Sequence, residues 1–252
     1  MSDETSQEFS PKYEPPRELL EITVSKLLAG TTREAMTAPQ LELLASVTTT
    51  NGFEPHLFVA GNIDLLKGRC VSIIGARDAT PLGRARARRL ARELSAFGVV
   101  VMSGLAEGID TEAMRAAIAA NGHIVGVIGT PIDKAYPAQN KQLQEAIYKD
   151  HLLVSQFAIG ERTFQSNFPK RNRLMALLSD ATVVVEASDS SGTLHQAAEC
   201  VRLGRWLYIA RNVVENPSIS WPKRFEQYEK FRVLDNTADL VKTVFEAGSV
   251  QH

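Results

Sequence analysis

Long apolar runs, cysteine pairs and a strong net charge are all missing from this chain of 252 residues. No segment reaches the roughly 18–20 apolar residues that a membrane-spanning helix needs, and the acidic, polar first residues do not resemble a secretory signal. The net charge of −1 excludes a protein that is basic overall, so any nucleic-acid surface must be local. Cys70 and Cys200 lie in apolar segments, which predicts buried thiols and a cytoplasmic protein.

Metal-binding and catalytic patterns are missing as well. The sequence has no CxxC, HxxE or paired-histidine spacing, so we predict no metal site. Of the five histidines, only His195 is expected in a loop that follows a strand, and no nucleophile and base accompany it. Gly75 is followed by Ala76-Arg77, which is not the GxGxxG pattern of a dinucleotide site. We therefore expect a binding protein without a cofactor, and not an enzyme.

What the sequence does contain is a regular alternation of strand and helix patterns. Short β-branched runs closed by glycine or polar residues alternate with amphipathic helical segments, and this predicts an α/β protein with a doubly wound, mostly parallel sheet of the extended Rossmann-like type. The predicted strands are 55–61, 70–75, 99–102, 124–128, 152–155, 182–185, 206–209 and 231–234. The predicted helices include 111–121, 139–149, 171–179, 193–203 and 238–247.

The first 54 residues show a different pattern. Residues 1–16 are polar and contain three prolines, which predicts a disordered tail. Leucines at helical spacing around Leu19–Leu28 and again at Leu41–Leu44 predict a short helical lead-in over residues 17–54. The Rossmann-like domain is expected to cover residues 55–248.

Ligands of open parallel sheets bind outside the carboxyl ends of the strands, and the predicted loops at that edge carry suitable side chains. Glycine and small hydroxyl residues there can turn backbone N–H groups toward an anion. Asp110 is interpreted as the N-cap of the next helix. The candidate residues in these loops are Arg77, Ser103, Gly104, Lys134, Tyr136, Ser191, Gly192 and Thr193.

The most conspicuous stretch is Ser166–Arg173, which places Lys170, Arg171 and Arg173 at the start of a predicted helix. Pro169 suits a first helical turn, and cations crowded there suggest that a phosphate neutralises them. A solvated run of charge is the alternative. Asn167 and Phe168 share the stretch, and Phe168 beside Lys170, like Tyr136 beside Lys134, is typical of single-strand binding, in which bases stack on rings while cations contact phosphates.

These motifs together resemble the DNA-processing protein A family (DprA/Smf). The resemblance runs from about Pro55 to Ala210 in seven ordered motifs: Leu57–Asn62, Ile73–Arg77, Val101–Asp110, Ile128–Asp133, Tyr136–Asn140, Asn167–Arg173 and Ser191–Leu194. It implies an extended Rossmann fold that binds single-stranded DNA, forms a homodimer and helps to load a RecA-type recombinase. It also implies a cationic pocket of Arg77, Lys134, Lys170, Arg171 and Arg173, with Asn167 and Phe168 in the same loop.

The sequence departs from the family pattern at three places. Met114-Arg115-Ala116 replaces a His-Arg-Gly segment, His195-Gln196-Ala197 replaces an Ile-Thr-Ala segment, and Ala210-Arg211-Asn212 stands where Pro-Gly is usual. The residues after 212 are too few for a winged-helix domain. A nucleotide-binding or nucleotide-hydrolysing protein related to the LOG phosphoribohydrolases is the alternative function, echoed by Ser191–Thr193 and Glu199. A protein-interaction scaffold without a ligand is a third.

Overall fold

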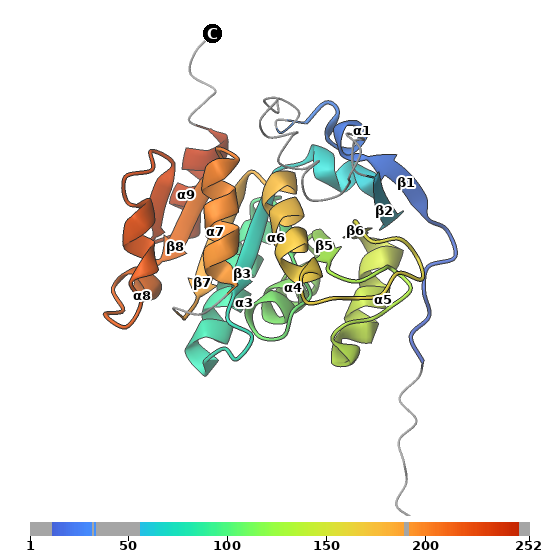
Figure 1. Ribbon diagram of the computed structural model, residues 1–252. Helices are drawn as coiled ribbons and strands as arrows, with labels where there is room; N and C mark the ends of the chain where they lie inside the picture. Colours follow the sequence, from blue (N-terminus) through green and yellow to red (C-terminus); the bar gives the residue numbers. More distant parts are fainter. Residues whose placement is uncertain (1–11, 32, 34–55, 189–191, 247–252) are drawn as a thin grey trace, which may run out of the picture.

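Each short β-branched run of the sequence becomes a strand of one sheet in the computed structural model, which describes residues 12–31, 33, 56–188 and 192–246. The strands are β1 (Leu20–Thr23), β2 (His56–Gly61), β3 (Cys70–Gly75), β4 (Val100–Ser103), β5 (Ile124–Ile128), β6 (Leu152–Ser155), β7 (Ala181–Glu186), β8 (Trp206–Ala210) and β9 (Phe231–Leu234). They form a nine-stranded sheet in the order β1-β2-β6-β5-β4-β3-β7-β8-β9 (Figure 1).

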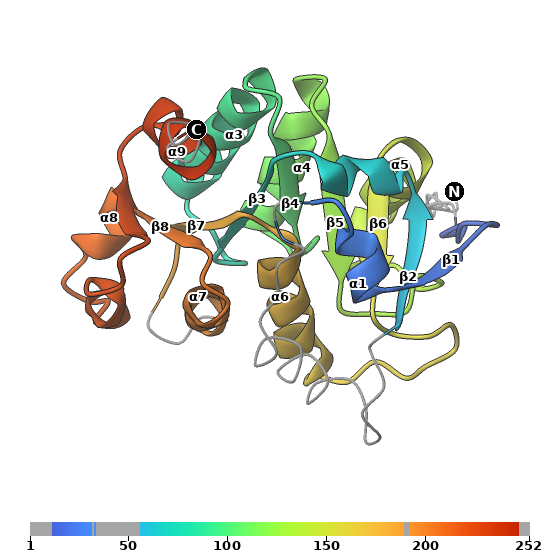
Figure 2. The ribbon, with the colours of Figure 1, turned by 90° about the horizontal axis from the view of Figure 1, so that it is seen from above.

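The α-helices are α1 (Val24–Leu28), α3 (Pro81–Ala96), α4 (Ile109–Ala119), α5 (Lys141–Asp150), α6 (Asn167–Leu178), α7 (Thr193–Arg202), α8 (Arg211–Val214) and α9 (Thr237–Phe245). Three short 3₁₀ helices, η1 (Ile63–Lys67), η2 (Ala138–Asn140) and η3 (Trp221–Phe225), complete the described elements. Figure 2 shows α6 and α7 on one face of the sheet and α3, α4 and α9 on the other. Two separate apolar clusters correspond to these two faces, as expected for a sheet buried on both sides.

The strand order places a reversal between β3 and β7. From β3 the chain adds β4, β5 and β6 on one side, then returns to pair β7 with β3 and adds β8 and β9 on the other side. All of these pairs are parallel. A reversal of this kind opens a crevice at the carboxyl ends of the strands, where ligands of doubly wound proteins bind.

These observations confirm the predicted fold class. The eight predicted strands agree with β2 to β9 to within one residue at each end. The helix that was expected from residue 171 begins earlier, at Asn167, so Pro169 lies in its first turn. The Asp110 prediction is wrong, because Gly108 is the N-cap of α4 and Asp110 is the second residue inside the helix.

The lead-in is not helical throughout. Leu20–Thr23 forms β1, which pairs antiparallel with β2, and β2 in turn pairs antiparallel with β6. The helical prediction is therefore wrong for these four residues. Backbone pairing with the neighbouring strand overrides a leucine pattern that spans only a few turns of a helix. Leu41–Leu44, and the boundary at residue 54, lie outside the described residues.

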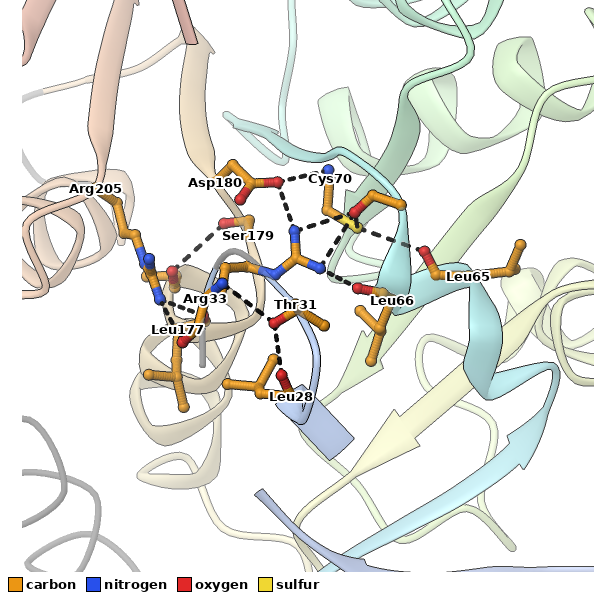
Figure 3. A network of polar contacts seen from close by, with 12 residues as sticks. Leu28, Thr31, Arg33, Leu65, Leu66, Cys70, Leu177, Ser179, Asp180 and Arg205 are labelled. Carbon is orange, nitrogen blue, oxygen red and sulfur yellow. Dashed lines mark hydrogen bonds and ion pairs between the residues drawn. The ribbon is translucent and has the colours of Figure 1, made fainter. Parts of the chain in front are cut away.

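Arg33 ties the lead-in to the amino-terminal edge of the sheet (Figure 3). Its side chain is fully buried, and its Nη1 donates to Asp180 Oδ2 at 2.5 Å. Both terminal nitrogens of the guanidinium also donate to the Gly68 carbonyl at 3.2 Å, and Nη2 donates to Leu66 O. Asp180 Oδ2 also accepts from the backbone N–H of Cys70, at 2.8 Å. The charge and both terminal nitrogens of Arg33 are therefore satisfied by groups of the protein, while its buried Nε has no hydrogen-bond partner.

Both cysteines are buried free thiols. Burial raises the pKa of Cys70 and that of Cys200 to about 12, so at neutral pH both are protonated. In the part of the chain that the structure describes, no helix combines the length and the hydropathy needed to cross a membrane.

Candidate nucleic-acid interface

Arg171 forms the floor of the site. It lies in α6 with 4% of its surface exposed, and its Nη1 donates to the carbonyl of Val127 near the end of β5, at 3.1 Å. Burial lowers the pKa of Arg171, and the charge of Asp110, itself 4% exposed, opposes that shift. Because an arginine starts from so high a pKa, the group stays cationic at neutral pH.

Gly104, at the end of β4, is the residue that makes room for Arg171. A Cβ atom at Gly104 would lie 1.4 Å from Arg171 Nη1, so a side chain there is incompatible with this position of the guanidinium. The Gly104 amide donates to Asp110 Oδ2 at 3.0 Å, which holds the carboxylate next to the same loop. Burial raises the pKa of Asp110, and Arg171 is the largest influence that lowers it.

Above this floor lies a hollow of about 140 Å³. We call it the aromatic pocket, and it is bordered by Arg77, Gly104, Ala106, Glu107, Gly129, Tyr136, Pro137, Phe168 and Arg171. The ring centroids of Tyr136 and Phe168 are 5.4 Å apart, and the Arg77 guanidinium lies 5.5 Å from the centre of the Phe168 ring. Tyr136 is 50% exposed. The pocket thus combines two rings and two cations, one of them buried, with one exposed carboxylate, that of Glu107.

A larger hollow of about 590 Å³, here called the crevice, adjoins the aromatic pocket at the reversal between β3 and β7. Arg77 and Arg171 border both spaces. Glu186, at the end of β7, is committed to structure, because its two oxygens accept from the amide and hydroxyl of Thr80 at 2.7 and 2.6 Å. Gln196 is 1% exposed, lines the crevice and has an Nε2 without a hydrogen-bond partner.

Two of the predicted anion-binding groups are used internally. The Ser103 hydroxyl donates to Ile73 O at 2.6 Å, and the Gly104 amide donates to Asp110. The sequence prediction that this turn offers its donors to a ligand is therefore wrong for these two groups. The turn contributes space and a buried carboxylate instead. That role was missed because Asp110 was interpreted as a helix cap.

The basic side chains of α6 point in different directions. Arg171 points inward, whereas Arg173 Nη2 pairs with Glu199 Oε1 of α7 at 3.1 Å, an oxygen that Arg202 also contacts at 2.5 Å. Lys170 is half-buried and does not border either hollow. The prediction of one pocket shared by all three cations is therefore wrong, because successive residues of a helix point in different directions.

The remaining predicted residues are scattered around the same edge. Lys134 Nζ donates to the carbonyl of Glu161 at 2.7 Å. Asn167 is buried under the loop and has an Nδ2 without a partner. Gly192 and Thr193 line the crevice at the start of α7, and Ser191 lies outside the described residues. Among residues 12–31, 33, 56–188 and 192–246, no group of three or more His, Cys, Asp or Glu side chains could hold a metal ion.

Comparison with known proteins gives a consistent family. The sequence profile of the DNA recombination-mediator protein A family matches residues 42–244. DNA processing protein DprA of Streptococcus pneumoniae is 40% identical over 149 residues, which are 59% of this chain and 52% of that protein. The chain spans about half the length of the curated relatives it matches.

Solved structures agree in fold. The crystal structure of DprA from S. pneumoniae superposes with a TM-score of 0.69 at 33% identity, covering 75% of this chain and 66% of that one. A structure from Helicobacter pylori, titled for the single-stranded DNA binding mode of its DNA processing protein A, gives a TM-score of 0.68 at 24% identity and covers 81% of this chain and 92% of that one. At that identity the second likeness concerns the fold alone.

Proposed function

The chain belongs to the DNA recombination-mediator protein A family, and from this premise we propose that it is a single-stranded DNA-binding protein whose strand passes through the aromatic pocket. The observation that carries the proposal is the buried Arg171 beneath two aromatic rings, with a second cation, Arg77, at the rim. A cation beside an aromatic platform suits an unpaired strand, since each base has a face that can stack and each nucleotide carries a phosphate.

The geometry assigns different parts of the strand to different groups. Tyr136 is half exposed and presents a ring surface on which a base can stack. Arg77 is exposed and able to contact a phosphate outside the pocket, while Arg171 supplies a fixed positive charge below. A base inside a duplex is already stacked on both faces, so the pocket favours single strands over duplex DNA.

We also propose that the protein acts by binding and not by catalysis. Three of the four carboxylates that border the two hollows accept hydrogen bonds from the protein: Glu186 from Thr80, Asp110 from Gly104 and Glu107 from Gln139. A general base needs a carboxylate or imidazole within hydrogen-bond reach of the reacting group. Incubation with single-stranded DNA should therefore leave the DNA intact, and release of a base or a cleaved strand would contradict this.

Family membership motivates two further proposals about partners. The first is a homodimer, for which light scattering should give twice the chain mass at micromolar concentration, and a monomer mass would contradict it. The second is cooperation with a RecA-type recombinase. In its support, we expect the protein to speed the assembly of recombinase filaments on DNA strands that are already covered, and an unchanged assembly rate would refute it.

The test of DNA binding is a fluorescence-anisotropy titration with labelled oligo-dT at two salt concentrations. The variant Arg77→Ala should bind more weakly, and its dependence of log affinity on log salt should be shallower by about 0.7, the value for one phosphate contact on a single strand. Arg92→Ala is the matched control, because Arg92 is an exposed arginine of α3 that borders neither hollow. Equal binding by the wild type and by Arg77→Ala would overturn the assignment.

The crevice supports a second candidate function, the binding of a small nucleotide. Gln196, a buried side chain whose Nε2 has no hydrogen-bond partner, borders this space, and Gly192 and Thr193 place a helix start beside it. A helix start with an adjacent amide can receive a phosphate and a base edge. Calorimetry with a nucleoside monophosphate checks this, and Gln196→Leu should weaken the binding if it occurs.

A further inference from the structure

The segment Lys12–Pro16, predicted to belong to a disordered tail, is fixed against α5. The hydroxyl of Tyr13 donates to Ile132 O at 2.8 Å and accepts from Gln144 Nε2 at 2.8 Å. Gln144 is 1% exposed, so this anchor is built into the interior. The disorder prediction is therefore wrong for residues 12–16, because the buried amide of Gln144 offers the Tyr13 hydroxyl a hydrogen-bond partner. Residues 1–11 lie outside the described residues.

Two hydrogen bonds to the next residue extend this attachment. Tyr148 donates its hydroxyl proton to Glu14 O at 2.6 Å, and the Glu14 amide donates to Glu145 Oε1 at 3.1 Å. The partners, Gln144, Glu145 and Tyr148, share one side of α5. Such repeated contacts give the segment a defined position, and they place Lys12 beside the loop that follows β5.

A hollow of about 400 Å³ lies between this segment, the loop after β5 and the start of α5. We call it the basic groove. It is bordered by Lys12, Tyr13, Asp133, Lys134, Ala135, Ala138 and Lys141. The lining residues include three lysines and one aspartate, so together they carry a net positive charge. The bond from Lys134 goes to a neutral carbonyl, that of Glu161, and therefore leaves its charge in place.

The basic groove and the aromatic pocket are separated by a single loop. Lys134 and Ala135 border the groove, the next two residues, Tyr136 and Pro137, border the pocket, and Ala138 again borders the groove. A strand whose base stacks on Tyr136 therefore leaves the pocket across this loop and meets the lysines. Along this path the groove supplies cations. Tyr13 also borders the groove, but its hydroxyl already donates one hydrogen bond and accepts another within the protein.

We propose that the basic groove is a second binding surface for single-stranded DNA, which contacts the sugar–phosphate backbone beyond the aromatic pocket through Lys12 and Lys141. The inference rests on the proposed function, because the strand must first occupy the pocket. Since these contacts come from lysine side chains to the backbone of the strand, the contribution of the groove is independent of base sequence and falls with salt. It also depends on strand length, because a short strand ends within the pocket.

The experiment compares Lys12→Ala/Lys141→Ala with the wild type on oligo-dT of about 5 and about 20 nucleotides, lengths chosen around the known range of single-strand site sizes. On the longer strand, the slope of log affinity against log salt should be shallower for the variant by about 1.4, because two phosphate contacts are lost. Between about 50 and 200 mM salt, the wild type should therefore lose about sevenfold more affinity than the variant. On the shorter strand the two proteins should bind alike.

Lys26→Ala/Lys223→Ala is the matched control, because it removes two exposed lysines that border neither space. An unchanged slope on the longer strand, with normal wild-type binding, would overturn the groove while leaving the pocket standing. An equal loss on both strand lengths would place the two lysines at the pocket and also overturn it. Failure of the wild type to bind either strand would refute the proposed function itself.

Discussion

Arg33 and Arg171 are both buried arginines, yet they lie at opposite edges of the same sheet and in different surroundings. Arg33 is 0% exposed at the amino-terminal edge, where a carboxylate and two carbonyls receive its terminal nitrogens. Arg171 is 4% exposed at the carboxyl-terminal edge, where one hydrogen bond goes to Val127 O and two hollows border the side chain. Burial is therefore common to both, and Arg171 in addition borders two hollows.

The difference separates a structural charge from a binding charge. A buried guanidinium costs desolvation free energy, which hydrogen bonds and an opposite charge must offset. Around Arg33 the offset comes entirely from the protein, and the result joins the lead-in to η1 and to the start of β7. Around Arg171, Asp110 supplies part of the offset, and an incoming phosphate can supply more. The same residue type therefore serves stability at one edge and, by our proposal, recognition at the other.

The largest expected effect is the loss of stability in Arg33→Met. The variant takes from Asp180 its partner in a buried ion pair, and a loss of this kind costs about 3–5 kcal/mol of unfolding free energy. Urea denaturation measures it. Cys70 lies in the same network, so its thiol should react with a disulfide reagent faster than in the wild type, whose buried thiols have a pKa of about 12. DNA affinity per folded molecule should stay unchanged.

The control for this variant is Arg33→Met/Asp180→Asn. It removes both charges of the pair, so it should recover part of the lost stability, since an unpaired buried carboxylate is the main cost. A double variant no more stable than the single one would show that packing, and not charge, makes Arg33 important.

The next largest effect is a loss of DNA affinity in Arg171→Met/Asp110→Asn. Both buried charges disappear together, which limits the damage to the fold, while the pocket loses its floor cation. We expect binding to oligo-dT to weaken on the order of a hundredfold, about 2.8 kcal/mol. Asp110→Asn alone keeps the cation and serves as the control. The comparison of the two edges fails if the double variant binds DNA normally, or if Arg33→Met loses as much affinity per folded molecule.

The sequence predicted the fold far better than the site, and the reason is physical. Strands such as Ile124–Ile128 are buried on both faces, so their apolar runs reveal them directly. Leu20–Thr23 was misjudged because a strand at the edge of a sheet depends on its partner, β2, and not on its own pattern. Arg33 was not recognised at all, because its carboxylate partner lies 147 positions away and no local signal connects the two.

The site residues also fall into those that the sequence pattern predicted and those that depend on contacts between distant segments. Arg77, Tyr136, Phe168 and Arg171 come together in the aromatic pocket, because they follow or precede strands whose ends meet at one edge. The use of Gly104 as a space for Arg171, and the position of Asp110, depend on contacts between segments far apart in the chain. The position of Lys12 at the basic groove could not be predicted for the same reason, since it depends on the hydrogen bond from Gln144 to the neighbouring Tyr13.

A smaller loss of affinity is expected for Tyr136→Ala. Stacking of a base on an aromatic side chain is worth about 1–3 kcal/mol, and because the ring is half exposed we expect the lower value, about a fivefold loss. The unfolding free energy should change little, since an exposed ring contributes little to the core. Tyr136→Phe should retain the affinity, because stacking needs the ring and not the hydroxyl. A large loss in the phenylalanine variant would instead indicate a hydrogen bond to the DNA.

The smallest effect is expected for Arg173→Ala, although the basic stretch of the sequence places this residue with the phosphate-binding cations. In the structure its guanidinium pairs with Glu199 on α7, and Glu199 keeps Arg202 as a second partner when Arg173 is removed. The pair is only partly buried, so we expect a loss of stability below about 1 kcal/mol and a change in DNA affinity within about twofold. Titration beside Arg171→Met/Asp110→Asn gives the sharpest contrast, because the two arginines are two residues apart on one helix. A loss in Arg173→Ala comparable to that of the double variant would mean that DNA pulls Arg173 away from Glu199 and that the cations of α6 act as one cluster after all.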